Sequence, residues 1–188
     1  MEQREITCGA IAKIIRERSE AGDLIQFEEI FSELVGQGLL KSEVADQRLH
    51  FEGILRQTVE KNEDIKEISG RDGIPRYYST QSLSKSYVRI LIKKEESPLS
   101  LMAEIIRENS AIYPRPVPLE IFRESPFDLT QEEILNYLEK MREQGEYQDI
   151  AQTTTSIGTV FLYSNQHLDQ SYASMLAEWL DVGQANNP

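Results

Sequence analysis

Side chains that could perform catalysis or bind a metal are few in this sequence. It contains two histidines, His50 and His167, and one cysteine, Cys8, and none has the spacing of a CxxC or HExxH metal motif. No nucleophile elbow and no phosphate-binding glycine loop appears. His50 lies between Leu49 and Phe51 in a helical pattern, which favours a packing or surface role. The sequence therefore predicts a protein that is not an enzyme and needs neither a cofactor nor a metal.

Arginine and lysine form the most suggestive functional pattern. Residues 66–94 hold seven Lys and Arg against two Asp and Glu, a net of +5 in a chain whose total is −12. Arg71 and Arg76 flank a predicted hairpin turn, from which guanidinium groups can reach phosphates or a narrow minor groove. The alternative is that these are ordinary surface charges balanced by acidic neighbours. The predicted nucleic-acid contacts are Arg48, Arg56, Arg71, Arg76, Lys85 and Arg89.

Negative charge is concentrated in the second half of the chain. Residues 1–96 carry 15 basic and 18 acidic side chains, whereas residues 97–188 carry 5 and 14, a net of −9. The second half should therefore repel nucleic acid. The chain shows no membrane-spanning apolar run, no signal-peptide pattern and only one cysteine, which together predict a cytoplasmic protein.

The elements that must position these residues occur twice. Residues 11–33 and 102–124 agree at ten of 23 positions without a gap, and residues 78–91 and 163–176 agree at seven of 14. A repeat of this length indicates two copies of one small domain. We expect the domains to span residues 1–96 and 97–188.

Each copy has the periodicity of a mostly helical α+β unit. In the first, Ile11, Ile14 and Ile15 mark a helix that Thr7 could cap, and 30–34 marks a second helix. A third helix is expected over 42–61 with Ser42 as its cap, followed by a β-hairpin over 65–69 and 74–80. The apolar positions Leu83, Tyr87, Ile90 and Leu91 indicate a fourth helix.

The second copy repeats this order. Thr130 and Glu133 fit a capping box for its third helix, over 130–144. A hairpin is expected over 147–152 and 159–164, and aligning Ile68 with Ile150 makes its tip longer than that of the first copy. The closing helix carries a wide apolar line that is the predicted partner-binding or dimer surface: Leu168, Tyr172, Met175, Leu176 and Trp179.

Matching residues in the two copies predict matching contacts. Arg16 and Arg107 occupy equivalent positions, and we expect them to pair with Glu33 and Glu124 at the ends of the second helices. Tyr87 and its counterpart Tyr172 should pack the closing helices onto their own units. The predicted cores comprise Ile14, Ile15, Ile30, Phe31, Leu34, Leu55 and Ile68, and Ile105, Ile106, Ile121, Phe122, Leu138 and Ile150.

Three helices followed by a two-stranded hairpin, with a short extended segment after the first helix, resemble the winged-helix form of the helix-turn-helix. The resemblance covers nearly the whole chain, twice, and depends on element order, not on a signature motif. It implies recognition helices over 42–61 and 130–144 and wings over 71–75 and 153–158. Pro114, Pro116 and Pro118 lie where the second short strand should be, which predicts an edge strand or an extended arm.

Two functions follow from this resemblance. One is a DNA-binding transcription regulator that docks on duplex DNA through the first unit. The other is a protein-interaction scaffold, because acidic accessory subunits of chromosome-condensing and membrane-trafficking complexes are similar tandem winged-helix proteins. The second unit would then hold a protein partner or a second copy of the chain, with no membrane contact.

Overall fold

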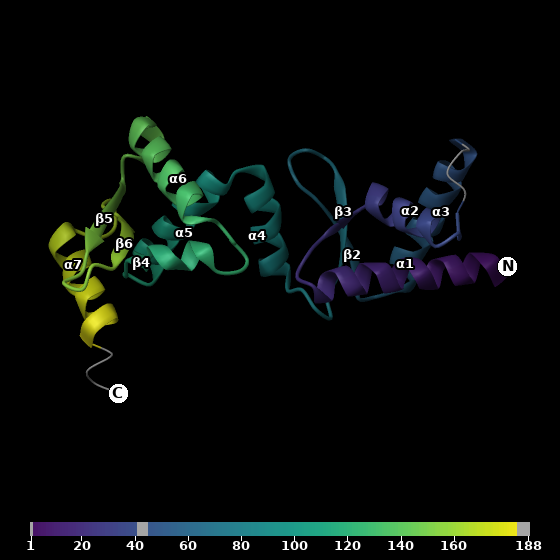
Figure 1. The fold of residues 1–188 in the computed structure, drawn as a ribbon, viewed down its shortest axis with the longest axis horizontal. Coiled ribbons are helices and arrows are strands. Elements are labelled where there is room, and N and C mark those ends of the chain that lie inside the picture. The colour runs from purple at the N-terminus through teal and green to yellow at the C-terminus, as the bar shows by residue number, and fades with distance from the viewer. Residues whose placement is uncertain (1, 41–44, 184–188) are drawn as a thin grey trace. The chain divides into compact units, whose positions relative to one another are not determined.

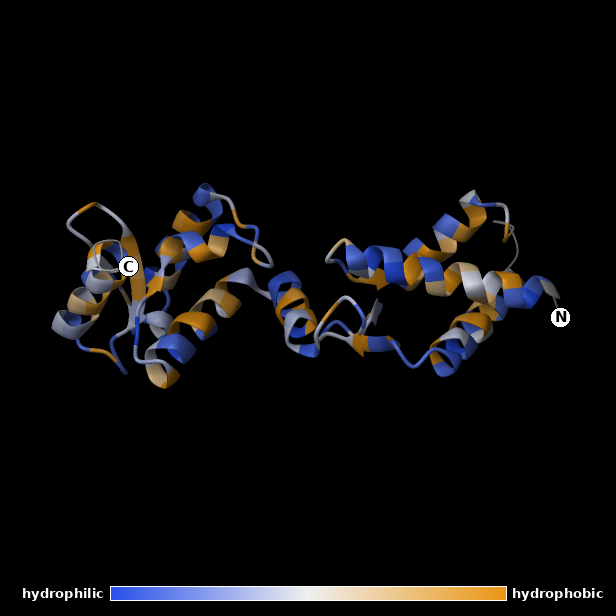
Figure 2. Ribbon diagram, turned by 90° about the horizontal axis from the view of Figure 1, so that it is seen from below, coloured by the Kyte–Doolittle hydropathy of each residue, from blue (hydrophilic) through white to orange (hydrophobic). Residues whose placement is uncertain are grey.

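The computed structural model describes residues 2–40 and 45–183 and divides into two compact units, Met1–Ile92 and Lys93–Pro188 (Figure 1). Both units have an α+β fold, and both follow the order helix, short strand, helix, helix, hairpin, helix. The division comes after Ile92, inside the helix that closes the first unit, whereas the sequence placed it after Glu96. The helices have hydrophobic and hydrophilic faces, as expected for helices that cover a small core (Figure 2).

The first unit packs helices against both faces of a small antiparallel sheet. The strand order is β1-β3-β2, so the last strand of the hairpin is central. Gly73, at a φ of 70°, provides the left-handed residue that the turn between β2 and β3 requires. The elements are α1 (Glu2–Glu20), β1 (Ile25–Gln26), α2 (Phe27–Gly36), α3 (Ala45–Lys61), β2 (Ile65–Ser69), β3 (Pro75–Ser79) and α4 (Lys85–Glu96).

The main core of the first unit lies between α1, α2 and α3. Ile15 of α1, Leu34 of α2 and Phe51 of α3 are fully buried there. The Phe51 ring tilts against those of Phe27 and Phe31, with centroids 4.7 and 5.4 Å away. A smaller cluster, formed by Tyr78, Leu83 and Val88, holds α4 to the sheet.

The second unit repeats this plan with several changes in its helical segments. Its sheet has the order β4-β6-β5, which corresponds to the order in the first unit. The counterpart of α2 is a short 3₁₀ helix that ends at Arg123. A longer helix through Pro126 is disfavoured, because proline has no N–H group to donate. The elements are α5 (Pro98–Ile112), β4 (Val117–Pro118), η1 (Leu119–Arg123), α6 (Gln131–Glu143), η2 (Gly145–Tyr147), β5 (Ile150–Thr154), β6 (Val160–Ser164), α7 (Gln170–Glu178) and the π-helical turn η3 (Trp179–Gly183).

The predicted capping box of Thr130 with Glu133 is confirmed and begins α6. Ser97 caps α5. Thr7 does not begin a helix, because α1 starts at Glu2 and the Thr7 hydroxyl donates to the Gln3 carbonyl inside it. The expected cap at Ser42 lies outside the described residues. Four predicted core residues are only half-buried: Ile68, Ile105, Ile121 and Ile150.

The two hairpins have equal length, so the prediction of a longer second tip is wrong. Ile65 pairs with Ser79 in the first hairpin, and Ile150 pairs with Ser164 in the second. The two hairpins therefore correspond at one constant offset of 85 residues. This register matters for the polar residues that flank the strands.

Candidate partner-binding surface

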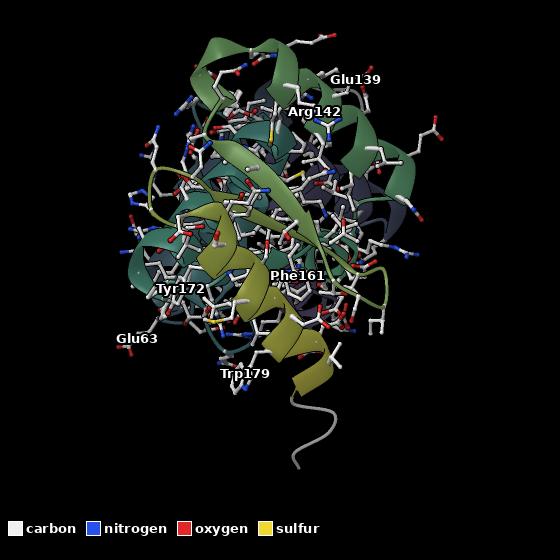
Figure 3. All side chains as sticks on the ribbon, turned by 90° about the vertical axis from the view of Figure 1, so that its left-hand side faces the viewer. Glu63, Glu139, Arg142, Phe161, Tyr172 and Trp179 are labelled. Carbon is white, nitrogen blue, oxygen red and sulfur yellow. The ribbon has the colours of Figure 1, made fainter. Side chains whose placement is uncertain are left out.

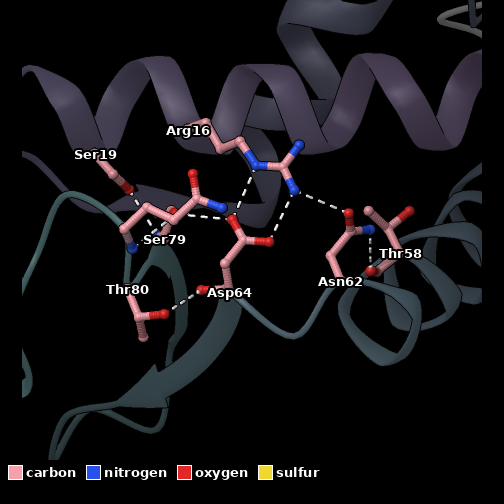
Figure 4. Close-up of polar contacts among 8 residues, drawn as sticks. Arg16, Ser19, Thr58, Asn62, Asp64, Ser79 and Thr80 are labelled. Atoms are coloured by element: carbon pink, nitrogen blue, oxygen red, sulfur yellow. Dashed lines mark hydrogen bonds and ion pairs between the residues drawn. The ribbon is translucent and has the colours of Figure 1, made fainter.

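A polar cluster joins the first helix to the hairpin in the first unit (Figure 4). The Arg16 Nε and Nη2 atoms donate to the two Asp64 carboxylate oxygens at 2.9 and 2.8 Å, and Nη2 also donates to Asn62 Oδ1. The Ser79 hydroxyl donates to Asp64, and the Ser79 amide donates to Ser19 Oγ. The Arg16 hydrogen bond lowers the pKa of Asp64 to about 2, because it stabilises the charged carboxylate.

The same cluster recurs in the second unit. The Arg107 Nε atom donates to Asp149 Oδ2 at 2.9 Å, the Ser164 hydroxyl donates to the same oxygen, and the Ser164 amide donates to Ser110 Oγ. Arg107 also lowers the pKa of Asp149. These carboxylates lie within a fixed network, so we assign both clusters a structural role.

The predicted arginine partners, Glu33 and Glu124, are therefore wrong. The sequence contains a signal for the true partners, because the 85-residue offset of the hairpins aligns Asp64 with Asp149. The alignment of Ile68 with Ile150 concealed this match. In the described part of the chain, no group of three His, Cys, Asp or Glu could hold a metal ion.

Arg76 is not available to nucleic acid, contrary to prediction. Its residue is 5% exposed, and its guanidinium donates to both oxygens of Asp72 and to the Ile74 carbonyl. These hydrogen bonds lower the pKa of Asp72. The side chain therefore fastens the hairpin turn and does not project from it.

The other predicted nucleic-acid contacts are exposed, but two of them face carboxylates. Arg48 pairs with Glu28 and lies over the Phe31 ring, 5.7 Å from its centroid. Arg56 lies 4.0 Å from Glu52. The remaining residues come from two places, the turn after β2 and the exposed side of α4: Arg71, Lys85 and Arg89.

The predicted partner line on the closing helix divides into buried and exposed members. Tyr172, Met175 and Trp179 are 43, 57 and 57% exposed. Their spacing of i, i+3 and i+7 places them along one helical face, and Figure 3 shows Tyr172 of α7 and Trp179, the first residue of η3, projecting from the same side. Leu176 is half-buried. Leu168 is a core residue that packs with Tyr163 and Ala173, so its assignment to the partner surface is wrong.

The opposite face of α7 is fastened to the hairpin. The Ser174 and Thr153 hydroxyls are 2.8 Å apart, and the Thr155 hydroxyl donates to Asp181 at 2.6 Å. The Ser156 amide donates to Glu178 at 2.9 Å. The exposed apolar face therefore belongs to a helix held on its other side.

A cavity of about 640 Å³ lies beside the edge strand β4. Its apolar lining comes from the proline-containing segment, η1, β6 and η3, and its polar lining includes Arg115, Glu120 and Asp181. The Arg115 guanidinium also lies 5.6 Å from the centroid of the Tyr113 ring. The lining residues are Asn109, Arg115, Pro116, Val117, Pro118, Glu120, Ile121, Thr159, Phe161, Leu180 and Asp181.

The first unit provides an internal comparison for this surface. Tyr87, the counterpart of Tyr172, is half-buried against the small cluster under α4, whereas Tyr172 is exposed, contrary to prediction. At the same offset, Trp179 corresponds to Lys94 near the end of α4, which the division after Ile92 assigns to the second unit. The Lys94 ammonium group donates to the Pro126 carbonyl and to Asp128. The closing helix of the second copy thus exposes an aromatic ring where α4 has a lysine with polar partners.

Comparisons with known proteins assign no activity to this surface. The family model described as the YdhW C-terminal domain matches residues 96–185, which correspond closely to the second unit. The chain is 27% identical to "Uncharacterized protein YdhW" from Escherichia coli (strain K12) over an alignment of 181 residues. This alignment covers 95% of this chain and 80% of that protein. No solved structure gives a significant match.

The residues described by the structure include no helix long and apolar enough to cross a membrane.

Proposed function

We propose that this chain is a non-enzymatic protein-interaction subunit, built from two winged-helix-like domains, that binds a partner through the α7 face. The α7 face consists of Tyr172, Met175 and Trp179. The observation that carries the proposal is that these three large apolar side chains line one face of a fastened helix and are each about half exposed. Aromatic residues and methionine are enriched in protein interfaces. Trp and Tyr are also frequent among the few residues that provide most of the binding free energy.

The charge around the α7 face favours a basic partner. Residues 93–188 carry seven basic and 16 acidic side chains, a net of −9. Asp169 caps the N-terminus of the same helix, so two copies of this face would bring two acidic units together. Three partly exposed side chains also provide much less than the roughly 800 Å² per partner of a standard interface. A partner protein that has a groove with basic residues at its rim would be attracted by the negative charge. Such a groove would also bury more surface around these side chains than a second copy of the face would.

Site-specific photo-crosslinking in the cells that express the protein tests this proposal. A photoreactive phenylalanine analogue at position 175 should give an adduct of one defined mass with another protein. The same analogue at Leu135, which is 54% exposed on α6, is the matched control. Adducts of equal yield at both positions, or no adduct at position 175, would contradict the proposal that the α7 face binds a partner. An adduct between two copies of the chain would identify a homodimer as the occupant.

DNA binding through the first unit is a second candidate. The observation in its favour is the exposure of Arg71, Lys85 and Arg89 on a unit whose element order resembles a winged helix. Replacing these three with Ala should weaken the binding of random duplex DNA and flatten its salt dependence. A control triple replacement of Arg4, Lys13 and Lys61, which are also exposed in this unit, changes the net charge equally. Equal affinity of the two triple variants for DNA would show that the wing and α4 do not form the DNA-binding surface.

We propose that this chain is located in the cytoplasm, where the environment is reducing. Cys8 is its single cysteine and is a free thiol, so no disulfide contributes to the fold.

A further inference from the structure

We infer that the cavity beside β4 anchors the partner by taking apolar side chains from an extended, cationic peptide segment. This inference builds on the proposed function, because it identifies the chemistry of the partner. The cavity volume, about 640 Å³, falls within the range of roughly 300 to 1,000 Å³ that is usual for binding pockets.

One apolar residue of the cavity lining lies where the first unit has a charged residue. Phe161 pairs with Pro118 across the sheet, as Arg76 pairs with Gln26 in the first unit, so the two residues occupy corresponding positions. In the first unit, the side chain of Arg76 is buried and its guanidinium donates to Asp72. In the second unit, the Phe161 ring lines the cavity and leaves apolar space that a side chain can enter.

The edge strand beside the cavity is poorly suited to pairing with another strand. β4 is at the edge of its sheet, but Pro116 and Pro118 have no backbone N–H group to donate. A partner segment therefore cannot bind as a regular additional strand. It must be recognised mainly through its side chains, which the apolar lining of Ile121 and Leu180 can accept.

The charged groups at the cavity select a cationic segment. Glu120 and Asp181 contribute two negative charges and Arg115 one positive charge, within a unit of net −9. Lysine or arginine residues next to the apolar side chains of the partner segment would be attracted by this negative charge. Arg115 is a donor only, so it can bind the backbone carbonyl oxygens of the same segment.

Fluorescence anisotropy with defined peptides tests this inference on the full chain. The probe is a short fluorescein-labelled peptide in which leucines alternate with lysines. Replacing its leucines with alanine should weaken binding roughly 10- to 100-fold, the loss expected for a buried apolar side chain. Replacing its lysines with glutamate should abolish binding. Equal binding of the leucine and alanine peptides, or no binding of the lysine peptide, would overturn the inference.

Protein variants locate the binding site. Ile121→Ser removes an apolar wall, and Glu120→Lys reverses a charge at an exposed position where folding should not be affected. Both should weaken binding of the leucine–lysine peptide, whereas the control Leu135→Ser should not. Two-dimensional NMR spectra of each variant verify the fold and show which residues the peptide shifts.

The same experiment separates the cavity from the α7 face. Loss of binding in Ile121→Ser and Glu120→Lys but not in Met175→Ser would support the cavity and contradict a role of the α7 face for this peptide. The reverse pattern would overturn the cavity inference and leave the proposed α7 face in place. Weaker binding in all three variants would support one continuous partner surface.

Discussion

An aspartate in each unit connects the first helix of that unit to its hairpin. Asp64 and Asp149 each accept hydrogen bonds from an arginine of the first helix and from a serine at the end of the hairpin. Each cluster therefore connects elements that are far apart in the chain. Because both copies retain the arginine, the aspartate and the serine, the cluster is the strongest structural evidence that one unit was duplicated.

Removing the charge of Asp149 should destabilise the second unit. Its side chain is 2% exposed and pairs with Arg107, so Asp149→Asn leaves the arginine without its charged partner. We expect a loss of about 2 kcal/mol in the free energy of unfolding, less than for a fully buried pair because Arg107 can still reach water. The control is Asp128→Asn, which removes an exposed partner of Lys94 and should cost below about 1 kcal/mol. Urea unfolding measures both, and equal losses would show that the cluster is not stabilising.

Acid should weaken the fold through the same carboxylates. The folded state lowers the pKa of Asp64 from 3.8 to about 2, and it also lowers that of Asp149. The stabilisation is therefore complete above the unfolded pKa and is lost as the pH falls through the folded one, between about pH 4 and pH 2. The melting temperature should fall across this window, and by a smaller amount in Asp64→Asn. An equally steep fall in that variant would exclude Asp64 as a source of the pH dependence.

At the scale of the elements, the 3₁₀ helix η1 is the main difference between the two copies. The α2 helix of the first unit has ten residues, whereas η1 has five. Phe122 is nevertheless fully buried from this short element, with its ring centroid 5.3 Å from that of Phe127. One aromatic ring of η1 therefore takes part of the packing role that a longer helix has in the first unit.

Deleting this ring should be costly. We expect Phe122→Ala to lower the free energy of unfolding by about 3–5 kcal/mol, because it removes a buried aromatic side chain and leaves a cavity. Leu135→Ala, on the exposed side of α6, should change it by less than about 0.5 kcal/mol. Chemical denaturation compares the two variants. A small effect of Phe122→Ala would mean that the neighbouring residues of η1 collapse into the vacated space.

Elements with a local signal could be predicted, whereas contacts between distant residues could not. The capping box at Thr130 specifies the start of α6 because its hydrogen bonds are local. The Arg76–Asp72 pair is local, but the burial of Arg76 also depends on strand pairing with Gln26 of β1, which no window of neighbouring residues contains. The exposure of Tyr172 likewise depends on tertiary packing, since the same residue type at Tyr87 is half-buried.

At the scale of the whole molecule, net charge determines which associations are favourable. The chain carries −12, and residues 93–188 account for −9 of it. A polyanion or a second copy of the α7 face must approach against this charge, whereas a basic protein is attracted by it. The apolar side chains provide affinity in either case, so charge decides between partners that are similarly apolar.

The direction of the salt dependence should therefore distinguish a basic partner from a second copy of the chain. Between about 0.1 and about 1 M NaCl, the Debye length falls from about 10 to about 3 Å, so charges around Trp179 are largely screened at the higher concentration. Binding of a cationic peptide should weaken over this range, because the attraction of the acidic unit is lost. Self-association should instead strengthen, because the repulsion between two acidic copies is lost.

Light scattering on the protein alone and anisotropy with the leucine–lysine peptide measure the two responses. Peptide binding that is insensitive to salt would contradict the charge argument. A dimer that forms at low salt and is lost in Trp179→Ala would show that apolar contact outweighs repulsion and that the chain is its own partner.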